Sequence, residues 1–116
     1  MKRGEVWVAN LNPQRGREVG KIRPALVLQA DWLTGQGAPT VLIAPMTTQR
    51  WESLDALRVE VPARDRLRKN CYVLAEKLRA LDRDKFGEGP LATLTGTEME
   101  AVERNLLAVL GIRVRS

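Results

Sequence analysis

The sequence has no histidine among its 116 residues and a single cysteine, Cys71. Without histidine the chain lacks the commonest general base in enzymes, the commonest metal ligand and the usual physiological pH switch. A Ser-His-Asp triad is therefore excluded, and one thiol cannot form a disulfide or a thiolate metal cluster within one chain. Cys71 lies in the apolar run CYVLA, so we expect a buried structural thiol and a reducing, cytoplasmic environment.

Long apolar runs and phosphate-binding motifs are also missing. No apolar run approaches the ~18 residues that span a bilayer, and neither GxxxxGK[ST] nor GxGxxG occurs. Asp82 and Asp84 stand two apart without clustered acidic partners, which is typical of solvated turn residues and not of a two-metal site. We therefore expect no membrane association, no metal and no cofactor.

Basic side chains, above all arginines, are what the sequence has in excess. It carries 19 basic against 14 acidic residues, a net charge of +5, and 44% of its residues are hydrophobic. The planar guanidinium group binds phosphate through two parallel hydrogen bonds and stacks on bases. A polyanionic partner is indicated, although such a charge also serves solubility. Length and apolar content suit one domain spanning residues 1–116.

Short apolar segments with turn residues between them predict a mainly β protein. The expected strands are residues 4–11, 24–30, 40–49, 57–62 and 71–81. Their connections are too short for crossover helices, so an antiparallel meander or a small curved barrel is favoured. Pro45 lacks an N–H group for the ladder, which predicts that the third strand lies at an edge or is bulged there. Residues 12–22 read as a basic loop and 31–39 as a turn.

One helix is expected near the C-terminus. Thr95 and Glu98 form a capping-box pattern, and Gly111 is a helix stop. Helical spacing puts an apolar stripe on one face, which we expect to cover the open side of the sheet. Its members are Met99, Val102, Leu106, Val109 and Leu110.

A candidate phosphate-binding site follows from the second and third expected strands. If these strands form a hairpin, Arg23 and Thr47 lie at its mouth, because they are equidistant from Gly35 in the turn. A guanidinium with a nearby hydroxyl can clamp a phosphate. The alternative is that the threonine is an ordinary strand residue and the arginine a solvated charge.

Four blocks of the sequence resemble, in the right order, the MazF/PemK/Kid-type ribonuclease toxins of toxin–antitoxin modules. They are RGEVWVANLNPQRGREVGKIRPALVLQ, TVLIAPMTTQ, VLAEKLRALD and TLTGTEMEAVERNLLAVLGI. The family's opening signature appears as Arg3-Gly4-Glu5, Pro13, Gly16, Glu18 and Arg23-Pro24. The match covers nearly the whole chain.

The resemblance implies an SH3-like, strongly curved antiparallel sheet with helical cover, acting as a homodimer. It also implies metal-independent, sequence-specific cleavage of single-stranded RNA, with Arg23 and Thr47 at the scissile phosphate. The first loop, which carries Glu18, closes over the site in such proteins. Attack by the RNA's own 2′-hydroxyl would leave a 2′,3′-cyclic phosphate and a 5′-hydroxyl. Because arginine is essentially never deprotonated, Glu18 or a bound water is the easier proton acceptor.

Further residues are expected to bind the RNA around this centre. Trp51 is either a stacking platform for a base or a partly buried cover for the strand end. In the block Glu76-Lys77-Leu78-Arg79 a lysine replaces the glutamine usual in the family, which leaves the recognised bases open. The complete expected set is Arg15, Arg17, Lys21, Thr48, Gln49, Trp51, Lys77 and Arg79.

The resemblance also implies a cognate antitoxin whose acidic, disordered tail folds onto the toxin, as the positive charge would favour. Two alternatives remain. One is a toxin of the same fold that poisons DNA gyrase; those proteins depend on a tryptophan-containing tail, and this sequence ends Arg113-Val114-Arg115-Ser116. The other is a noncatalytic SH3-like module that binds RNA or protein.

Overall fold

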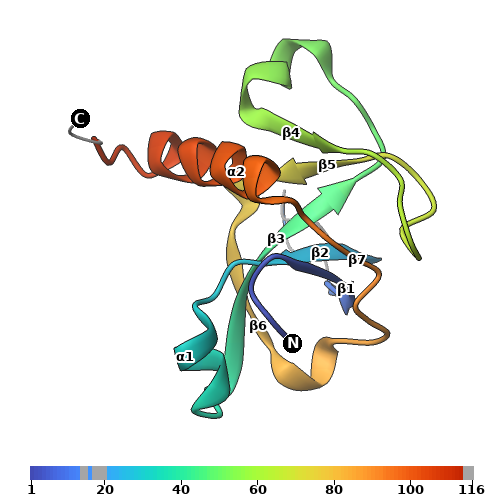
Figure 1. Ribbon diagram of the computed structural model, residues 1–116, viewed down its shortest axis with the longest axis vertical. Helices are drawn as coiled ribbons and strands as arrows, with labels where there is room; N and C mark the ends of the chain where they lie inside the picture. Colours follow the sequence, from blue (N-terminus) through green and yellow to red (C-terminus); the bar gives the residue numbers. More distant parts are fainter. Residues whose placement is uncertain (14–15, 17–20, 114–116) are drawn as a thin grey trace.

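The structure is a computed structural model and describes residues 1–13, 16 and 21–113. Its strands form one curled antiparallel sheet, with α2 lying along one side and α1 within the connection between β2 and β3 (Figure 1). The expected fold class, mainly β with a C-terminal helix, is confirmed. The strands are β1 Glu5–Asn10, β2 Ile22–Val27, β3 Thr40–Thr47, β4 Arg58–Val61, β5 Cys71–Leu74, β6 Arg79–Asp82 and β7 Ala92–Thr93. The helices are α1 Asp31–Gly35 and α2 Gly96–Val109, with 3₁₀ turns η1 Glu52–Leu57, η2 Ala75–Lys77 and η3 Arg83–Lys85.

Strand β3 is the centre of the sheet. The strand order is β4-β5-β3-β2-β1-β7, and β6 also pairs with β3. Residues 40–43 of β3 pair with β6, whereas Met46 and Thr47 pair with β5. Of the two expectations for Pro45, the edge strand is wrong, because β3 has neighbours on both sides, and the bulge stays a prediction. The proline lies in the gap where β3 changes partners, so no ladder bond is lost to it on that side.

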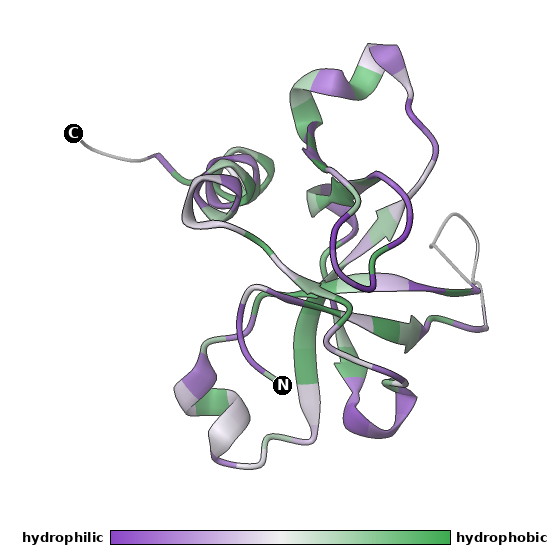
Figure 2. Ribbon diagram, turned by 45° about the vertical axis from the view of Figure 1, so that its right-hand side comes forward, coloured by the Kyte–Doolittle hydropathy of each residue, from purple (hydrophilic) through white to green (hydrophobic). Residues whose placement is uncertain are grey.

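The central strands are buried on both faces, because successive side chains point to opposite sides of a sheet. Leu26 and Met46 belong to a cluster that α2 covers through Met99 and Val102. The second cluster lies on the opposite face and contains Ala9, Leu11, Ala25, Val27, Val41, Ile43 and Leu81. Figure 2 shows the hydrophobic residues concentrated along the strands at the centre of the molecule.

Helix α2 begins where the sequence predicts it. The Thr95 hydroxyl accepts from the Glu98 N–H at 3.1 Å, and the Glu98 carboxylate accepts from the Thr95 N–H at 2.9 Å. However, Val109 and Leu110 are 40% and 57% exposed, so the expectation that the whole stripe faces the sheet is wrong at its end. The last turn of α2 extends beyond the sheet (Figure 1).

Three other expectations need correction. The segment 71–81 is not one strand, because η2 separates β5 from β6 and lets β3 pair with each in turn. The expected turn 31–39 contains the short helix α1, and β7 was not expected at all. With only two residues, β7 is recognised by its pairing with β1 and not by any pattern of its own. The other strands end within three residues of their expected bounds.

Candidate active site

The register of β2 and β3 aligns Arg23 with Thr47. Ala25 pairs with Pro45, Leu26 with Ala44 and Val27 with Ile43. Continuing this register by two residues sets Arg23 opposite Thr47, on the same face as Ala25 and Pro45. The hairpin expected from the sequence for these two strands is therefore confirmed.

The hydroxyl of Thr47 is held by the backbone that follows it. Its Oγ1 accepts a hydrogen bond from the N–H of Gln49 at 3.2 Å. A hydroxyl that accepts in this way keeps its own proton for a second partner. Thr47 closes β3 and is half-buried, whereas Thr48 and Gln49 are exposed directly after it. The side chain thus offers an oriented donor at the end of a rigid strand.

The same face continues across two further strands. Thr47 pairs with Tyr72 of β5, and Tyr72 pairs with Glu60 of β4. Directly paired residues in an antiparallel sheet share a face. Arg23, Thr47, Tyr72 and Glu60 therefore form a row across four neighbouring strands, which we call the cross-strand row. At the usual strand spacing it covers about 14 Å.

A polar hollow of about 340 Å³ lies at the Glu60 end of this row. Its walls are Arg50, Asp55, Arg58, Glu60 and Tyr72. We call it the polar hollow. It contains two guanidinium groups, two carboxylates and one phenol ring, so its charges of opposite sign are balanced.

Both arginines of the polar hollow are fixed by carboxylates. Arg50 donates to Asp55 through Nη2 at 2.6 Å and Nε at 3.3 Å, and these bonds hold the pKa of Asp55 below its ordinary value. Arg58 donates to Glu76 of η2 at 2.6 Å, and its side chain is only 9% exposed. The second pair ties β4 to the turn that separates β5 from β6.

The remaining expected RNA contacts lie on several elements around the row. Arg79 opens β6 opposite Ile43 of β3 and is half-buried on the same face as Arg23, while Lys77 ends η2. Trp51 lies just after Gln49 and is 60% exposed. This exposure argues against a partly buried cover, and the stacking role of Trp51 stays a prediction.

The base of the first loop is anchored at the edge of the site. The Lys21 N–H donates to Asn12 Oδ1 at 2.8 Å, and Lys85 Nζ donates to the Asn12 carbonyl at 2.8 Å. Lys21 is exposed. Arg15, Arg17 and Glu18 lie outside the described residues.

Within the residues that the structure describes, no group of three or more carboxylate, thiol or imidazole side chains could hold a metal ion. Asp82 and Asp84 are exposed around η3, as the sequence predicts. Cys71 is buried, and burial raises the pKa of its thiol, so it is a structural residue. None of the described helices is long and apolar enough to cross a membrane.

Three features of this region were not predicted from the sequence: Tyr72, Glu60 and the pair formed by Arg58 and Glu76. A signal for Tyr72 was present, because it alternates with the apolar Cys71 and Val73 and must face the opposite side of the sheet. The polar hollow itself forms because the connection that contains η1 folds back toward β4 and β5. No local sequence pattern predicts this fold.

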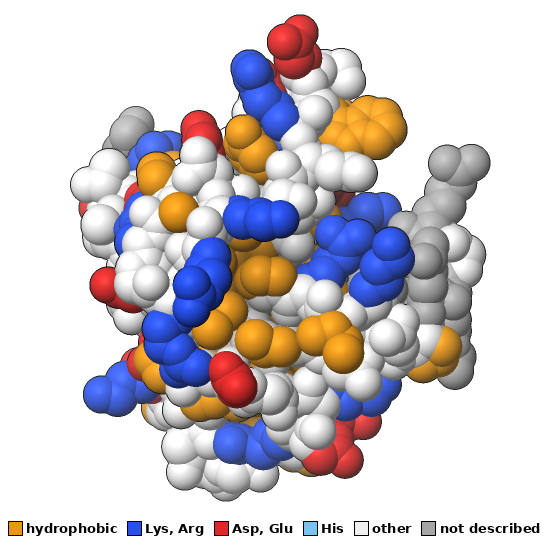
Figure 3. Space-filling view, turned by 90° about the vertical axis from the view of Figure 1, so that its right-hand side faces the viewer, with side chains coloured by type: hydrophobic (Ala, Val, Ile, Leu, Met, Phe, Trp, Pro, Cys, Tyr) orange, Lys and Arg blue, Asp and Glu red, His pale blue; other side chains and the backbone are white. Residues whose placement is uncertain are grey.

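Figure 3 shows that Lys and Arg side chains border a band of hydrophobic side chains on one face of the molecule. Cationic groups beside apolar surface are what a single-stranded nucleic acid needs, since its phosphates are charged and its bases stack. The family model for PemK-like, MazF-like toxins of type II toxin–antitoxin systems matches residues 2–110. The chain belongs to this toxin family.

Relatives of this PemK/MazF-like toxin match it over nearly its whole length. An endoribonuclease MazF from Staphylococcus saprophyticus is 33% identical over 97% of this chain and 92% of its own. The crystal structure of MazF from Deinococcus radiodurans is 28% identical with a TM-score of 0.83, covering 97% of each chain. A MazE–MazF crystal structure from the same organism gives 26% identity and a TM-score of 0.77, covering 97% of this chain and 98% of that one.

These similarities confirm the family and the fold expected for the toxin from the sequence blocks. The expected enzyme class, endoribonuclease, agrees with the name of the Staphylococcus relative. A second MazE–MazF crystal structure from Deinococcus radiodurans is also similar to this chain, with 27% identity and a TM-score of 0.77 over 97% of each chain.

Proposed function

We propose that this toxin is a metal-independent endoribonuclease that cuts single-stranded RNA at a short sequence. The observation that carries the proposal is the register of β2 and β3, which, continued by two residues, aligns Arg23 with Thr47. The family and the curated relative give the reaction class. A cation beside an oriented hydroxyl is the pair of groups that a breaking phosphodiester requires.

The reaction uses the substrate's own nucleophile. The 2′-hydroxyl attacks the adjacent phosphorus, its oxygen bonds to phosphorus, and the bond to the 5′-oxygen breaks. The products are a 2′,3′-cyclic phosphate and a 5′-hydroxyl, which takes up a proton. Arg23 neutralises the charge that grows on the phosphoryl oxygens, and the Thr47 hydroxyl donates a hydrogen bond to one of them. Loss of one such donor commonly costs roughly 100-fold in rate.

The proton of the 2′-hydroxyl needs an acceptor other than Arg23. A guanidinium group stays protonated at any accessible pH, so the arginine serves as charge and not as base. We propose that Glu18 or a bound water molecule accepts this proton.

RNA binding extends beyond the reacting phosphate. Lys77 and Arg79 supply charge for neighbouring phosphates, and Thr48, Gln49 and Trp51 contact the nucleotides at the end of β3. The first loop contributes Arg15, Arg17 and Lys21.

We also propose that the protein is a homodimer and is inhibited by an acidic antitoxin. The support is the net charge of +5 and the family, in which the Deinococcus MazF has been crystallised with MazE. A disordered acidic tail that folds on binding would cover the cationic surface that RNA needs.

The test is a cleavage assay with a mixed-sequence RNA in EDTA. The wild-type protein is expected to give 5′-hydroxyl and cyclic-phosphate ends and to leave DNA of the same sequence intact, because DNA lacks the 2′-hydroxyl. Arg23→Ala and Thr47→Val should each lower the rate about 100-fold or more. Sequencing the 5′-hydroxyl ends would also give the recognised sequence.

Two matched variants control for general effects. Arg104→Ala removes an exposed guanidinium from α2, and Thr93→Val removes an exposed hydroxyl from β7. Both should cut at the wild-type rate. Intact RNA with the folded wild-type protein would contradict the proposal and favour a noncatalytic binding module.

A further inference from the structure

The polar hollow is unsuited to a phosphate. Its two arginines are opposed within the hollow by Asp55 and Glu60, and Arg58 is also paired with Glu76. A phosphate there would gain no net attraction and would face two carboxylates. An acidic peptide would meet the same repulsion. The occupant must instead be neutral and rich in hydrogen-bond donors.

Glu60 is the acceptor that such an occupant would meet. Within the part of the chain that the structure describes, its exposed carboxylate has no hydrogen bond or ion pair. An ionised carboxylate has two oxygens that can accept bonds from two adjacent donors. Tyr72, paired directly with Glu60, adds a half-buried aromatic ring on the same face. A planar ligand with two neighbouring N–H groups therefore fits the hollow.

The position of the hollow ties this ligand to the RNA. Tyr72 pairs with Glu60 on one side and with Thr47 on the other. A phosphate bound at Thr47 and a base bound at Glu60 would thus belong to neighbouring nucleotides of one RNA molecule. A hollow of about 340 Å³ lies within the size range of sites for small organic ligands, roughly 300 to 1,000 Å³.

Guanine is the RNA base whose donors match this acceptor. Its Watson–Crick edge carries the N1–H and the 2-amino group side by side. Adenine and cytosine offer one amino group beside an acceptor nitrogen, and uracil offers one N–H between two carbonyls. Guanine also has acceptors at O6 and N7, which arginine recognises. Arg50 keeps further N–H donors after bonding Asp55.

We propose that the polar hollow is a base-recognition pocket that selects a guanine next to the cleaved phosphodiester, with Glu60 accepting from its Watson–Crick edge and Tyr72 stacking on its ring. This inference rests on the proposed ribonuclease activity and adds to it the residues that set the sequence preference. Loss of one hydrogen bond to a charged group costs roughly 10- to 100-fold.

The experiment has two stages. First, cleavage sites of the wild-type protein on a mixed-sequence RNA are mapped, and a guanine is expected at one fixed position beside the cut. Then kcat/KM is measured on two oligonucleotides that differ only there, one with guanine and one with inosine, which lacks the 2-amino group. The wild-type protein should prefer guanine by roughly 10- to 100-fold. In Glu60→Gln the preference should fall by roughly 5- to 10-fold, because a neutral amide oxygen accepts a weaker hydrogen bond than a carboxylate does.

Glu100→Gln is the matched control, because it makes the same change on the exposed side of α2 and should keep the full preference. A wild-type protein that cuts without selecting guanine would overturn the inference and leave the ribonuclease intact. So would a Glu60→Gln variant that keeps the full wild-type preference for guanine over inosine. A wild-type protein that cuts no RNA would instead overturn the proposed function.

Discussion

At the scale of single residues, the proposed site works through a guanidinium group and a hydroxyl, those of Arg23 and Thr47. Both groups are hydrogen-bond donors, and the guanidinium adds a positive charge. Their contribution is placement: β2 and β3 fix the backbone, and the Gln49 N–H fixes the hydroxyl of Thr47 at 3.2 Å. A donor held in this way needs no reorganisation when charge develops on the phosphate. Their chemistry therefore depends on the two strands keeping their register.

The two exposed tryptophans allow a residue-scale prediction about binding. Trp51 is 60% exposed near the end of β3, and Trp32 is 68% exposed on α1, which joins β2 to β3 at the end opposite Arg23 and Thr47. Base stacking on an aromatic side chain contributes about 1–3 kcal/mol. Trp51→Ala should weaken the binding of a 2′-deoxy-substituted, uncleavable RNA by roughly 10- to 100-fold, measured by fluorescence anisotropy.

Trp32→Ala removes the same side chain from the other end of the molecule and should bind as the wild type does. Equal losses in both variants would show that Trp51 has no specific role in the interface.

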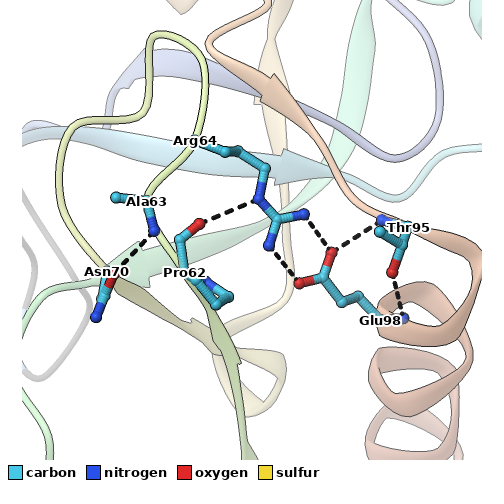
Figure 4. Close-up of polar contacts among 6 residues, drawn as sticks. All are labelled: Pro62, Ala63, Arg64, Asn70, Thr95 and Glu98. Atoms are coloured by element: carbon cyan, nitrogen blue, oxygen red, sulfur yellow. Dashed lines mark hydrogen bonds and ion pairs between the residues drawn. The ribbon is translucent and has the colours of Figure 1, made fainter.

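At the scale of elements, the start of α2 is locked to the β4–β5 connection. Arg64 donates to both oxygens of Glu98 at 2.6 Å and to the Pro62 carbonyl at 3.1 Å, while the same carboxylate accepts from Thr95 (Figure 4). In the same connection, Asn70 Oδ1 accepts from the Ala63 N–H at 2.8 Å. One carboxylate thus serves as both helix cap and ion pair, which holds the apolar face of α2 against the sheet.

This arrangement predicts a pH dependence of stability. Hydrogen bonds from Arg64 are the main cause that lowers the pKa of Glu98 from 4.5. A carboxyl whose folded pKa is lowered stabilises the fold fully above its unfolded pKa and loses this effect as pH falls through the folded pKa. Glu98→Gln should lower the free energy of unfolding at pH 7 by about 1.5–3 kcal/mol.

The measurement is urea unfolding of both proteins between pH 7 and pH 3. The difference in unfolding free energy between wild type and Glu98→Gln should stay constant down to about pH 5 and shrink below it. A difference that does not change with pH would show that the negative charge of Glu98 contributes nothing to the free energy of unfolding.

Elements also show what the sequence could and could not predict. Helix α2 and the pairing of β2 with β3 follow from local signals: a capping box, a helix stop and two apolar runs about a turn. The break of segment 71–81 at η2 and the gap at Pro45 do not follow from local signals, because both depend on β3 pairing first with β6 and then with β5. Arg23 and Thr47 were predicted together because they lie on one hairpin. Glu60 and Tyr72 were not, because their position depends on the pairing of β4 with β5 and of β5 with β3.

At the scale of the whole molecule, charge predicts how the proposed RNA binding responds to salt. The net charge is +5, and Arg23, Lys77 and Arg79 come from β2, η2 and β6, so no single element carries the cationic surface. Each phosphate neutralised on a single strand lowers the slope of log K against log salt by about 0.7. Three such contacts predict a slope of about −2.

Lys77→Gln tests this distribution of charge by removing one positive charge from η2. Its slope should be less steep by about 0.7, while Lys2→Gln, at the exposed N-terminus, should keep the wild-type slope. The slope is the informative quantity, because a lost base contact would weaken binding equally at all salt concentrations. An unchanged slope would mean that Lys77 contacts no phosphate and that the lysine acts on a base or on the fold.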